Sequence, residues 1–365
     1  MVADPAELDV GLSPTGAMPR NPAAAAAAPV ADPGLGAKVA FLSRPDSYPE
    51  PTGGVATVET HMSWVFLTER QAWKLKKPVR TAWVDFTTAA ARRQNCEAEL
   101  RLNRRLAPDV YLEIVPLALD DGGRLRLGAD GQVIDWLVRM RRLPAARMLD
   151  QLIGRGEATA EVIRRVVARL ARFYRDSVPV AVTASAYRAA FVEGNAENRR
   201  ELGAPAYGLP APLVTGVCVR LDTLLRARAE LVDDRVRTGR IVEAHGDLRP
   251  EHICIETEPQ IIDCLEFARA LRTLDAADEL AFLALECERL GAPELAVPIF
   301  GTYAEVTGDA PPATLLAFYR SYRACVRAKL AIRHLDDAAP REPSKWAAQA
   351  HAYLRLAEAH SARFA

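Results

Sequence analysis

One segment of the chain, His245-Gly-Asp-Leu-Arg-Pro-Glu-His252, sets several polar side chains close together in an expected loop. Asp247 supplies a carboxylate, and His252, five residues later, supplies a side chain that could bind a metal. A strand-like apolar run then ends at a second carboxylate, Asp263. Phosphoryl transfer needs one carboxylate to orient the attacking hydroxyl, and a second carboxylate with another polar ligand to hold Mg²⁺ against the nucleotide phosphates. Because Mg²⁺ keeps several waters, two protein ligands are sufficient.

The lysines form a second pattern. The chain has only six lysines, and three of them, Lys74, Lys76 and Lys77, fall within four positions. Lys74 and Lys76 are two residues apart on an expected strand, so their side chains would lie on the same face of it. The helix that follows offers two acidic side chains, Glu97 and Glu99. In a chain that otherwise prefers arginine, this cluster requires a specific explanation.

The elements that must position these residues follow from the hydrophobic pattern. Short apolar runs, several of them bounded by turn residues, predict strands at 55–59, 64–68, 72–76, 110–118, 124–127 and 132–140. One helix interrupts them at about 88–106. After Pro144 the pattern becomes helical and predicts helices near 162–174, 213–234, 275–290, 313–335 and 346–362, with one hairpin, 252–256 and 260–264. The expected fold class is α+β, with a small antiparallel sheet lobe carrying one helix and a larger helical lobe.

Composition argues against several classes of protein. Forty-seven Lys+Arg balance forty-seven Asp+Glu, which is untypical of a dedicated nucleic-acid binder. No apolar run approaches the roughly 18 residues that span a bilayer, and the first residues lack the basic and apolar regions of a signal peptide. The six cysteines include no C-x-x-C pair, which is poor spacing for a zinc or disulfide framework. We therefore expect a cytoplasmic protein that binds neither nucleic acid nor membrane.

The loop resembles the catalytic loop of protein kinases and, more closely, that of the aminoglycoside phosphotransferase-like kinases, which carry H-G-D. The resemblance implies that Asp247 is the catalytic carboxylate and Asp263 the magnesium ligand. Arg249 takes the place of the lysine that meets the transferred phosphate, and His252 stands where the family has a metal-binding Asn. Imidazole is a softer ligand than an amide oxygen, so Mn²⁺ could serve in place of Mg²⁺. His245 is expected to bond backbone near the loop.

The lysine cluster extends the resemblance, because Q-A-W-K at 71–74 occupies the place of the kinase V-A-I-K strand. Lys74 would therefore pair with the α/β-phosphates of ATP and with a helix carboxylate. Glu99 fits the family spacing better than Glu97. Lys76 is the fallback for Lys74; otherwise Lys76 and Lys77 are expected to be solvated charges at a strand edge.

Two more segments bear on the site. Asp275-Ala-Ala-Asp278-Glu-Leu-Ala281 resembles the D-x-x-x-D-L-A segment of the phosphotransferases, which makes Asp278 the buried carboxylate that supports the catalytic loop. No G-x-G-x-x-G occurs, and the turn in its place is Thr60-His-Met-Ser63, so backbone amides and Ser63 would cover the phosphates. The sequence also has no D-F-G motif, since Cys264 and Leu265 follow Asp263. Glu266 is either a second metal ligand or a surface carboxylate.

The resemblance runs from about 38 to 335. Four segments, THMSWVFL, AWKLKKPV, CEAELRLNRRLAP and YRACVRAKL, make it closer still to the phosphotransferase half of bifunctional proteins that also carry a P-loop ATP-binding domain. No G-x-x-x-x-G-K-[ST] occurs in the sequence, so we expect a stand-alone version. The implied organisation is a disordered Ala/Pro-rich tail (1–36), an N-terminal nucleotide-binding lobe (37–142) and a C-terminal helical catalytic and substrate lobe (143–365).

Together these features predict an ATP-dependent phosphotransferase that uses Mg²⁺, or Mn²⁺, to move the γ-phosphate to a hydroxyl of a small-molecule acceptor. The alternative is a nucleotide-binding pseudokinase without turnover, suggested by His252 and the missing glycines; a protein kinase is a third hypothesis. Arg320, Arg323 and Arg327 recur at helical spacing. They form either a solvated helix face or an anion site, and in the second case the acceptor is anionic.

Overall fold

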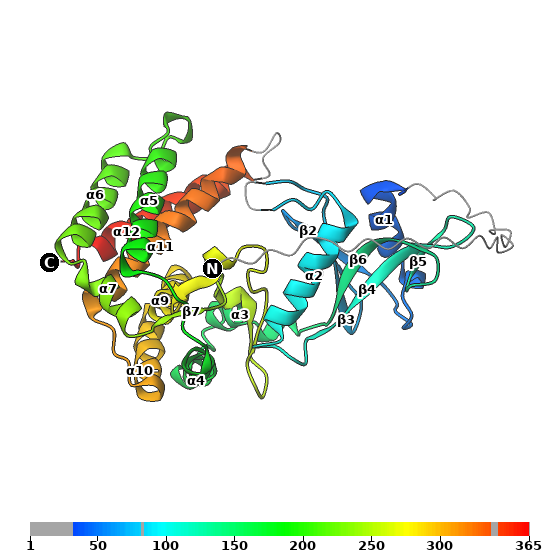
Figure 1. The fold of residues 1–365 in the computed structure, drawn as a ribbon, viewed down its shortest axis with the longest axis horizontal. Helices are drawn as coiled ribbons and strands as arrows, with labels where there is room; N and C mark the ends of the chain where they lie inside the picture. Colours follow the sequence, from blue (N-terminus) through cyan, green and yellow to red (C-terminus); the bar gives the residue numbers. More distant parts are fainter. Residues whose placement is uncertain (1–31, 82–83, 337–341, 365) are drawn as a thin grey trace, which may run out of the picture.

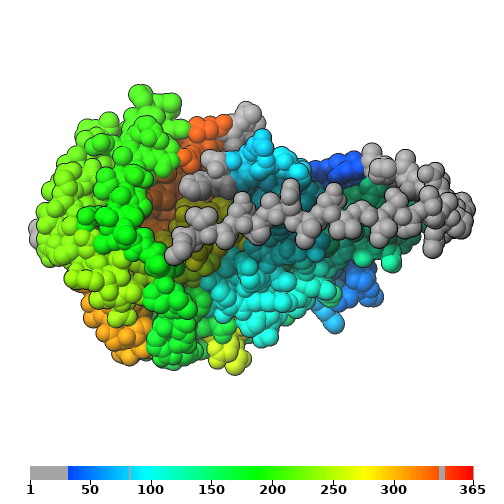
Figure 2. All heavy atoms as spheres, viewed as in Figure 1, coloured from blue at the N-terminus to red at the C-terminus, as the bar shows by residue number. Residues whose placement is uncertain are grey.

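A computed structural model describes residues 32–81, 84–336 and 342–364 of the chain. These residues form an α+β fold with a sheet lobe and a larger helical lobe, as the sequence predicted (Figure 1). Figure 2 shows the cyan surface of the sheet lobe beside the green and orange surface of the other lobe. Among the described residues, no helix is long and apolar enough to cross a membrane.

The small lobe is built on a six-stranded antiparallel sheet in the order β1-β2-β3-β6-β4-β5. All six predicted strands are present, and each end lies within one residue of its predicted position. The elements of this lobe are α1 (Gly34–Leu42), β1 (Ala56–Glu59), β2 (Ser63–Leu67), β3 (Gln71–Lys76), α2 (Ala89–Asn103), β4 (Tyr111–Leu119), β5 (Leu125–Leu127) and β6 (Gln132–Arg141).

Side chains of β3 alternate between the two faces of the sheet. Trp73 packs with Leu42 of α1 on one face, whereas Ala72 packs with Cys96 of α2 on the other. Alternation therefore directs Lys74 to the face that carries α2. The N-cap of α2 is Thr88, whose hydroxyl accepts from the backbone N–H of the third helical residue, so the sequence determines where this helix begins.

Most of the predicted disordered tail, 1–36, lies outside the described residues. The prediction is wrong for its last residues, because Gly34–Gly36 form the start of α1. This helix is held by a buried charge. Lys38 Nζ lies 2.8 Å from Asp135 Oδ2 on β6 and 2.7 Å from Asp32 Oδ2. A short helix with little amphipathic pattern is therefore fixed to the sheet by an ion pair that local sequence does not indicate.

The helical lobe surrounds α9, in which every residue from 276 to 287 is buried. The region expected to be one helix at 213–234 is two helices, and the hairpin pairs over only two residues in each strand. Nothing in the apolar pattern predicted α5 or α10. The elements of this lobe are α3 (Leu149–Gly154), α4 (Ala160–Asp176), α5 (Ala184–Leu202), α6 (Ala211–Ala227), α7 (Glu230–Arg237), β7 (Ile241–Glu243), β8 (Ile253–Cys254), β9 (Gln260–Ile261), α8 (Arg269–Arg272), β10 (Thr273–Asp275), α9 (Ala276–Arg289), α10 (Ala296–Thr307), α11 (Ala313–Arg333) and α12 (Pro343–Ser361).

Candidate active site

Three predicted site residues meet where the lobes join. Lys74 Nζ lies 2.8 Å from Glu99 Oε1 on α2 and 2.8 Å from Asp263 Oδ1, which follows β9 in the helical lobe. Burial alone would lower the pKa of Lys74, but the two carboxylates raise it well above its ordinary value. The other candidate, Glu97, lies on the exposed side of α2 and pairs with Arg93. The structure thus selects Glu99 over Glu97 as the partner of the lysine.

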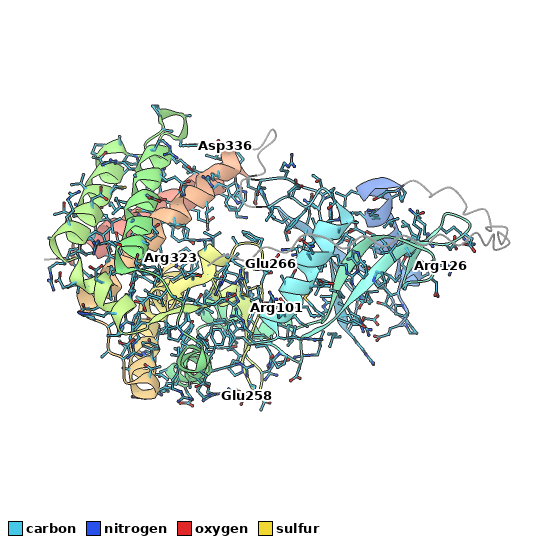
Figure 3. All side chains as sticks on the ribbon, viewed as in Figure 1. Arg101, Arg126, Glu258, Glu266, Arg323 and Asp336 are labelled. Carbon is cyan, nitrogen blue, oxygen red and sulfur yellow. The ribbon has the colours of Figure 1, made fainter. Side chains whose placement is uncertain are left out.

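The sequence predicted Lys76 to be a solvated charge, but the structure buries it. Its side chain is only 2% exposed, and its Nζ lies 2.5 Å from Glu99 Oε2 and 2.6 Å from Glu266 Oε1. Glu266 is accordingly not a surface carboxylate, since its side chain is 9% exposed and it lies at the junction of the lobes (Figure 3). Lys77 is also largely covered and pairs with Glu59. Glu99 therefore holds two buried lysines, and the second lysine links the lobes.

Ser63 is the first residue of β2 and pairs directly with Lys76 of β3. Residues opposite each other in an antiparallel pair share a face, so the buried Ser63 side chain lies on the lysine face. Its backbone amide donates to Thr60 Oγ1 at 3.0 Å within the turn. The Ser63 side chain thus lies on the same face as Lys76, and its amide is already engaged within the turn.

The backbone around Asp263 is held in an unusual conformation. Asp263 has φ 62°, a left-handed value that Asp tolerates better than most residues but that still costs energy. The N–H of Asp263 donates to the Tyr111 hydroxyl at 3.0 Å, and the N–H of Cys264 donates to Asn103 Oδ1 at 2.9 Å. Burial alone would raise the pKa of Asp263, but Lys74 holds it well below its usual range. The carboxylate is therefore ionised and directed toward the junction between the lobes.

A different carboxylate from the predicted one supports the catalytic loop. Glu279 of α9 accepts hydrogen bonds from the backbone N–H groups of His245, at 3.0 and 3.1 Å, and of Gly246, at 2.5 Å, and from the Tyr174 hydroxyl at 2.7 Å. Asp278 is buried, as expected, but its carboxylate binds Arg323 at 2.8 and 2.6 Å. The prediction of Asp278 as the loop support is thus wrong by one residue.

Gly246 is required by the conformation of this loop. Its φ of +91° is disfavoured for L side chains, and a Cβ there would lie 3.0 Å from Arg272 Cβ and 3.1 Å from Leu265 Cδ1. The glycine of H-G-D therefore allows the turn that brings two successive N–H groups to one carboxylate. This contact aligns the loop that carries Asp247.

His245 contacts backbone near the loop, as the sequence predicted. Its Nε2 lies 2.8 Å from the carbonyl oxygen of Ile262, which can only accept, so Nε2 carries the proton. Nδ1 then accepts from the N–H of Asp247 at 3.3 Å. Burial lowers the pKa of His245, which keeps the ring neutral. One imidazole thus fixes Asp247 relative to the strand that ends at Asp263.

The tautomer of His252 follows from its partners. Nδ1 lies 2.9 Å from the carbonyl oxygen of Asp247 and must donate, whereas Nε2 lies 3.0 Å from Arg249 Nη2 and must accept. The lone pair of Nε2 therefore faces Arg249, with Asp263 Oδ2 3.6 Å away. Arg249 also donates from Nε to Asp247 Oδ2 at 3.1 Å. The structure thus brings the four predicted residues of the loop and metal site together.

These side chains fit a divalent cation with two protein ligands. A carboxylate oxygen and an imidazole nitrogen 3.6 Å apart are both suitable donors, and the softer nitrogen suits Mn²⁺ better than Mg²⁺. Among the described residues, no three His, Cys, Asp or Glu side chains gather as a denser metal site. Lys74 and Lys76 bring two positive charges to the same junction, each paired with carboxylates.

Sequence reasoning did not identify several residues that position the site, namely Glu279, Tyr174, Tyr111 and Asn103. Only Glu279 carried a signal, because it adjoins Asp278 within the recognised segment.

The three arginines of α11 do not form the solvated helix face that was one of the two interpretations of the sequence. Arg323 and Arg327 bind buried carboxylates, and Arg320 lies over the Phe300 ring at 5.2 Å.

Comparison with known proteins places this geometry in a wider group. No family model matches the chain. Uncharacterised proteins of Mycobacterium bovis and of Mycobacterium tuberculosis are 34% identical over 309 residues, which are 83% of this chain and 59% of theirs. The match thus spans about three fifths of the length of these curated relatives.

Solved structures with the same architecture include small-molecule kinases. Choline kinase of Cryptosporidium parvum aligns over 88% of this chain and 94% of its own, at a TM-score of 0.51 and 9% identity. A thermostable mutant of an aminoglycoside phosphotransferase aligns over 84% of this chain and 95% of its own, at a TM-score of 0.48 and 11% identity. The resemblance stated from the motifs is confirmed at the level of the fold: the chain has the protein kinase-like fold of the choline kinase.

Proposed function

We propose that the protein is an ATP-dependent phosphotransferase that moves the γ-phosphate to a hydroxyl of a small molecule. The observation that carries the proposal is the meeting of Lys74, Glu99 and Asp263 from three separate elements beside the loop of Asp247. The fold supports it, because the chain shares that fold with an enzyme described as a choline kinase. Fold alone does not determine activity, so the proposed activity depends on the geometry of the site.

Each residue has a role in this mechanism. Lys74, held by Glu99, would bind the α/β-phosphates, and Asp263 with His252 would hold Mg²⁺ or Mn²⁺, which neutralises phosphate charge. Asp247 Oδ2 accepts from Arg249, so Oδ1 is the oxygen available to the acceptor hydroxyl. Asp247 would take the hydroxyl proton as that oxygen bonds to the γ-phosphorus, while the β,γ-bridging oxygen keeps the electron pair of the broken bond and departs as ADP. Arg249 would offset charge on the transferred group.

One observation favours the second candidate, a nucleotide-binding pseudokinase. His252 Nε2, the atom that would bind the metal, already accepts a hydrogen bond from Arg249. If this contact persists when nucleotide binds, the metal has only Asp263 as a protein ligand and turnover would be negligible. Nucleotide binding through Lys74 would survive.

Thermal unfolding with ATP or GTP, each with Mg²⁺ or Mn²⁺, tests the proposal. A ligand that binds only the native protein at 100 times its Kd adds about 2.7 kcal/mol to the free energy of unfolding. We expect a metal-dependent shift that is lost in Asp263→Asn and kept in Glu97→Gln, which alters an exposed carboxylate of α2. No shift with any nucleotide would contradict both candidates.

A second measurement separates the two candidates. We expect the protein to turn over ATP with metal, and Asp247→Asn to lose turnover at least about 100-fold, as is typical of a positioned general base, while its nucleotide-dependent shift remains. A native protein that binds nucleotide but shows no turnover with any acceptor supports the pseudokinase instead.

A further inference from the structure

A series of alternating charges extends from the catalytic loop into the helical lobe. Arg249 Nη1 donates to Glu251 Oε1 at 3.1 Å, besides its bond to Asp247. Arg289 of α9 lies 3.9 Å from Glu251 Oε1 and donates to Glu286 Oε2 at 2.8 Å. The loop and the C-terminal half of α9 are therefore connected by ion pairs.

Two arginines of α11 complete this network. Arg327 Nε lies 3.6 Å from Glu286 Oε1, and Glu286 Oε1 also accepts from the Tyr353 hydroxyl at 2.7 Å. One turn earlier, Arg323 binds Asp278 through Nε and Nη2. Burial alone would lower the pKa of Arg327, but Tyr353, Glu286 and Asp247 raise it. A series of ion pairs through Glu286, Arg289, Glu251 and Arg249 thus connects Arg327 to the carboxylate that would receive the acceptor hydroxyl.

The arginines of this network are more exposed than the carboxylates that they bind. The side chains of Asp278 and Glu286 are 1% and 0% exposed, whereas those of Arg323 and Arg327 are 13% and 18% exposed. The carboxylates lie beneath and orient the guanidinium groups. A molecule that approaches from the open side therefore meets guanidinium N–H groups rather than their buried partners.

These guanidinium groups keep donors that the fold does not use. Arg323 engages Nε and Nη2 on Asp278, and Arg327 engages Nε on Glu286 and Tyr353. Within the described part of the chain, Nη1 of Arg323 and both Nη atoms of Arg327 donate to no other residue. Buried carboxylates that fix an arginine and leave its outer edge open produce a preorganised site for an anion. Glu251, a half-buried carboxylate nearby, is already paired with Arg249.

We propose that the acceptor substrate carries an anionic group, a carboxylate or a phosphate, which binds the outer edges of Arg327 and Arg323 while its hydroxyl lies at Asp247. This inference rests on the proposed phosphotransferase function and specifies its substrate class. A cationic acceptor would bring like charge against the exposed guanidinium groups and would bind poorly.

Arg327→Met is the informative variant because it leaves Glu286 satisfied. Glu286 would still accept from Tyr353 and from Arg289, so the variant should fold. Arg323→Met, in contrast, would leave Asp278 buried without its partner. Arg327→Lys keeps a charge without the planar fork, and Arg333→Met is the matched control, since Arg333 lies on the same helix and pairs with Glu197 and Glu201.

The experiment starts from a small-molecule extract of bacterial cells, split at pH 7 on an anion exchanger before reaction. Each fraction is incubated with native protein, metal and ATP labelled in the γ-phosphate, and the acceptor of the labelled product is isolated. We expect that acceptor in the retained, anionic fraction. Its KM should rise about tenfold or more in Arg327→Met, with kcat changed far less, because the variant loses a charged hydrogen bond to the bound acceptor. Arg327→Lys should recover part of the loss, and the control should match the native protein.

Two results would overturn the inference, and only the second would also overturn the phosphotransferase function. An acceptor found in the unretained fraction, with the same KM in Arg327→Met and native protein, contradicts an anionic acceptor while the phosphotransferase function stands. No labelled product from either fraction, with Asp247→Asn indistinguishable from native protein, removes the phosphotransferase function and this inference with it.

Discussion

Two adjacent acidic residues of α9 have different tasks. Glu279 accepts from two backbone N–H groups of the catalytic loop, and Asp278 binds Arg323. Neighbouring positions on a helix point in different directions, so a difference of one residue exchanges a loop contact for a contact with α11.

Glu279→Gln tests the role of this carboxylate. The amide keeps one acceptor oxygen but sets an NH₂ group against a backbone N–H, which should cost about 1–3 kcal/mol. We expect kcat to fall as well, because the loop that carries Asp247 loses its alignment. Urea unfolding, together with kcat measured well below the unfolding transition, checks both effects. Asp278→Asn is the control: it should lower stability with little change in kcat, and equal kcat losses would contradict the assignment.

His252 bonds the Asp247 carbonyl, and in the proposed mechanism it also binds the metal. An Asn amide at this position could donate to the Asp247 carbonyl and present an oxygen to the metal. Because nitrogen ligands favour Mn²⁺ over Mg²⁺ relative to oxygen ligands, His252→Asn should lower the ratio of Mn²⁺-supported to Mg²⁺-supported activity several-fold. His252→Ala should lose activity with both metals. An unchanged ratio in the Asn variant would show that residue 252 does not contact the metal.

At the scale of elements, β3 presents two lysines to one glutamate of α2. The alternation of the strand places Lys74 and Lys76 on one face, and Glu99 lies between them. Each lysine also pairs with one carboxylate of the helical lobe. Lys74 pairs with Asp263, and Lys76 pairs with Glu266. The relative position of β3, α2 and the segment after β9 is thus set by ion pairs as well as by apolar packing.

Lys76→Met should destabilise the protein by about 3–5 kcal/mol, because it leaves Glu266 buried without its partner. Burial alone would lower the pKa of Lys76, but Glu266 and Glu99 raise it. A raised folded pKa gives stability that is complete below the unfolded value of about 10.4 and is lost as pH rises further. The difference in unfolding free energy between native protein and variant should therefore be constant from about pH 6 to about pH 9 and shrink above about pH 10.5.

Lys77→Met provides the control for this series, since Lys77 pairs with Glu59 outside the site. It should cost less than about 1 kcal/mol. Denaturant unfolding across pH measures all three proteins, and a Lys76→Met cost no larger than that of Lys77→Met would contradict a buried link between the lobes.

At the scale of the whole molecule, the connection after α2 ties the two lobes together. Arg105 donates to the carbonyl oxygens of Glu243 and Ala244 at 2.8 and 2.9 Å, directly before the catalytic loop. Arg169 of α4 donates to the carbonyl oxygen of Leu106 at 2.9 Å. The end of the helix that carries Glu99 is therefore anchored to the strand that leads to His245.

Arg105→Met should weaken this coupling. We expect a loss of about 1–3 kcal/mol from carbonyl groups left without a donor, and a broader calorimetric transition as the lobes unfold less cooperatively. Arg101→Met, an exposed position one turn earlier on α2 (Figure 3), is the control and should leave the transition unchanged. A single sharp transition in both variants would show that the lobes are coupled by other contacts.

The sequence by itself determined the strands, the α2 helix and the order of the site motifs, because each depends on a local pattern. Alternation places Lys74 and Lys76 on one face, and the resemblance to the phosphotransferases favours Glu99 and marks the loop of Asp247. Local pattern failed for α5, whose buried face includes Asn195 and Asn198, so its apolar period is interrupted.

Only the tertiary structure decided which charges are buried and which partners they meet. Lys76 looks solvated in the sequence because its partner Glu266 lies 190 residues away. The choice between Asp278 and Glu279, and the pairing of Arg323 and Arg327 with buried carboxylates, likewise depend on how α9 packs against the loop and α11. Once folding removes both charges from water, loss of one partner leaves the other buried and unpaired at a high cost, and burial of that kind is a property of the assembled fold.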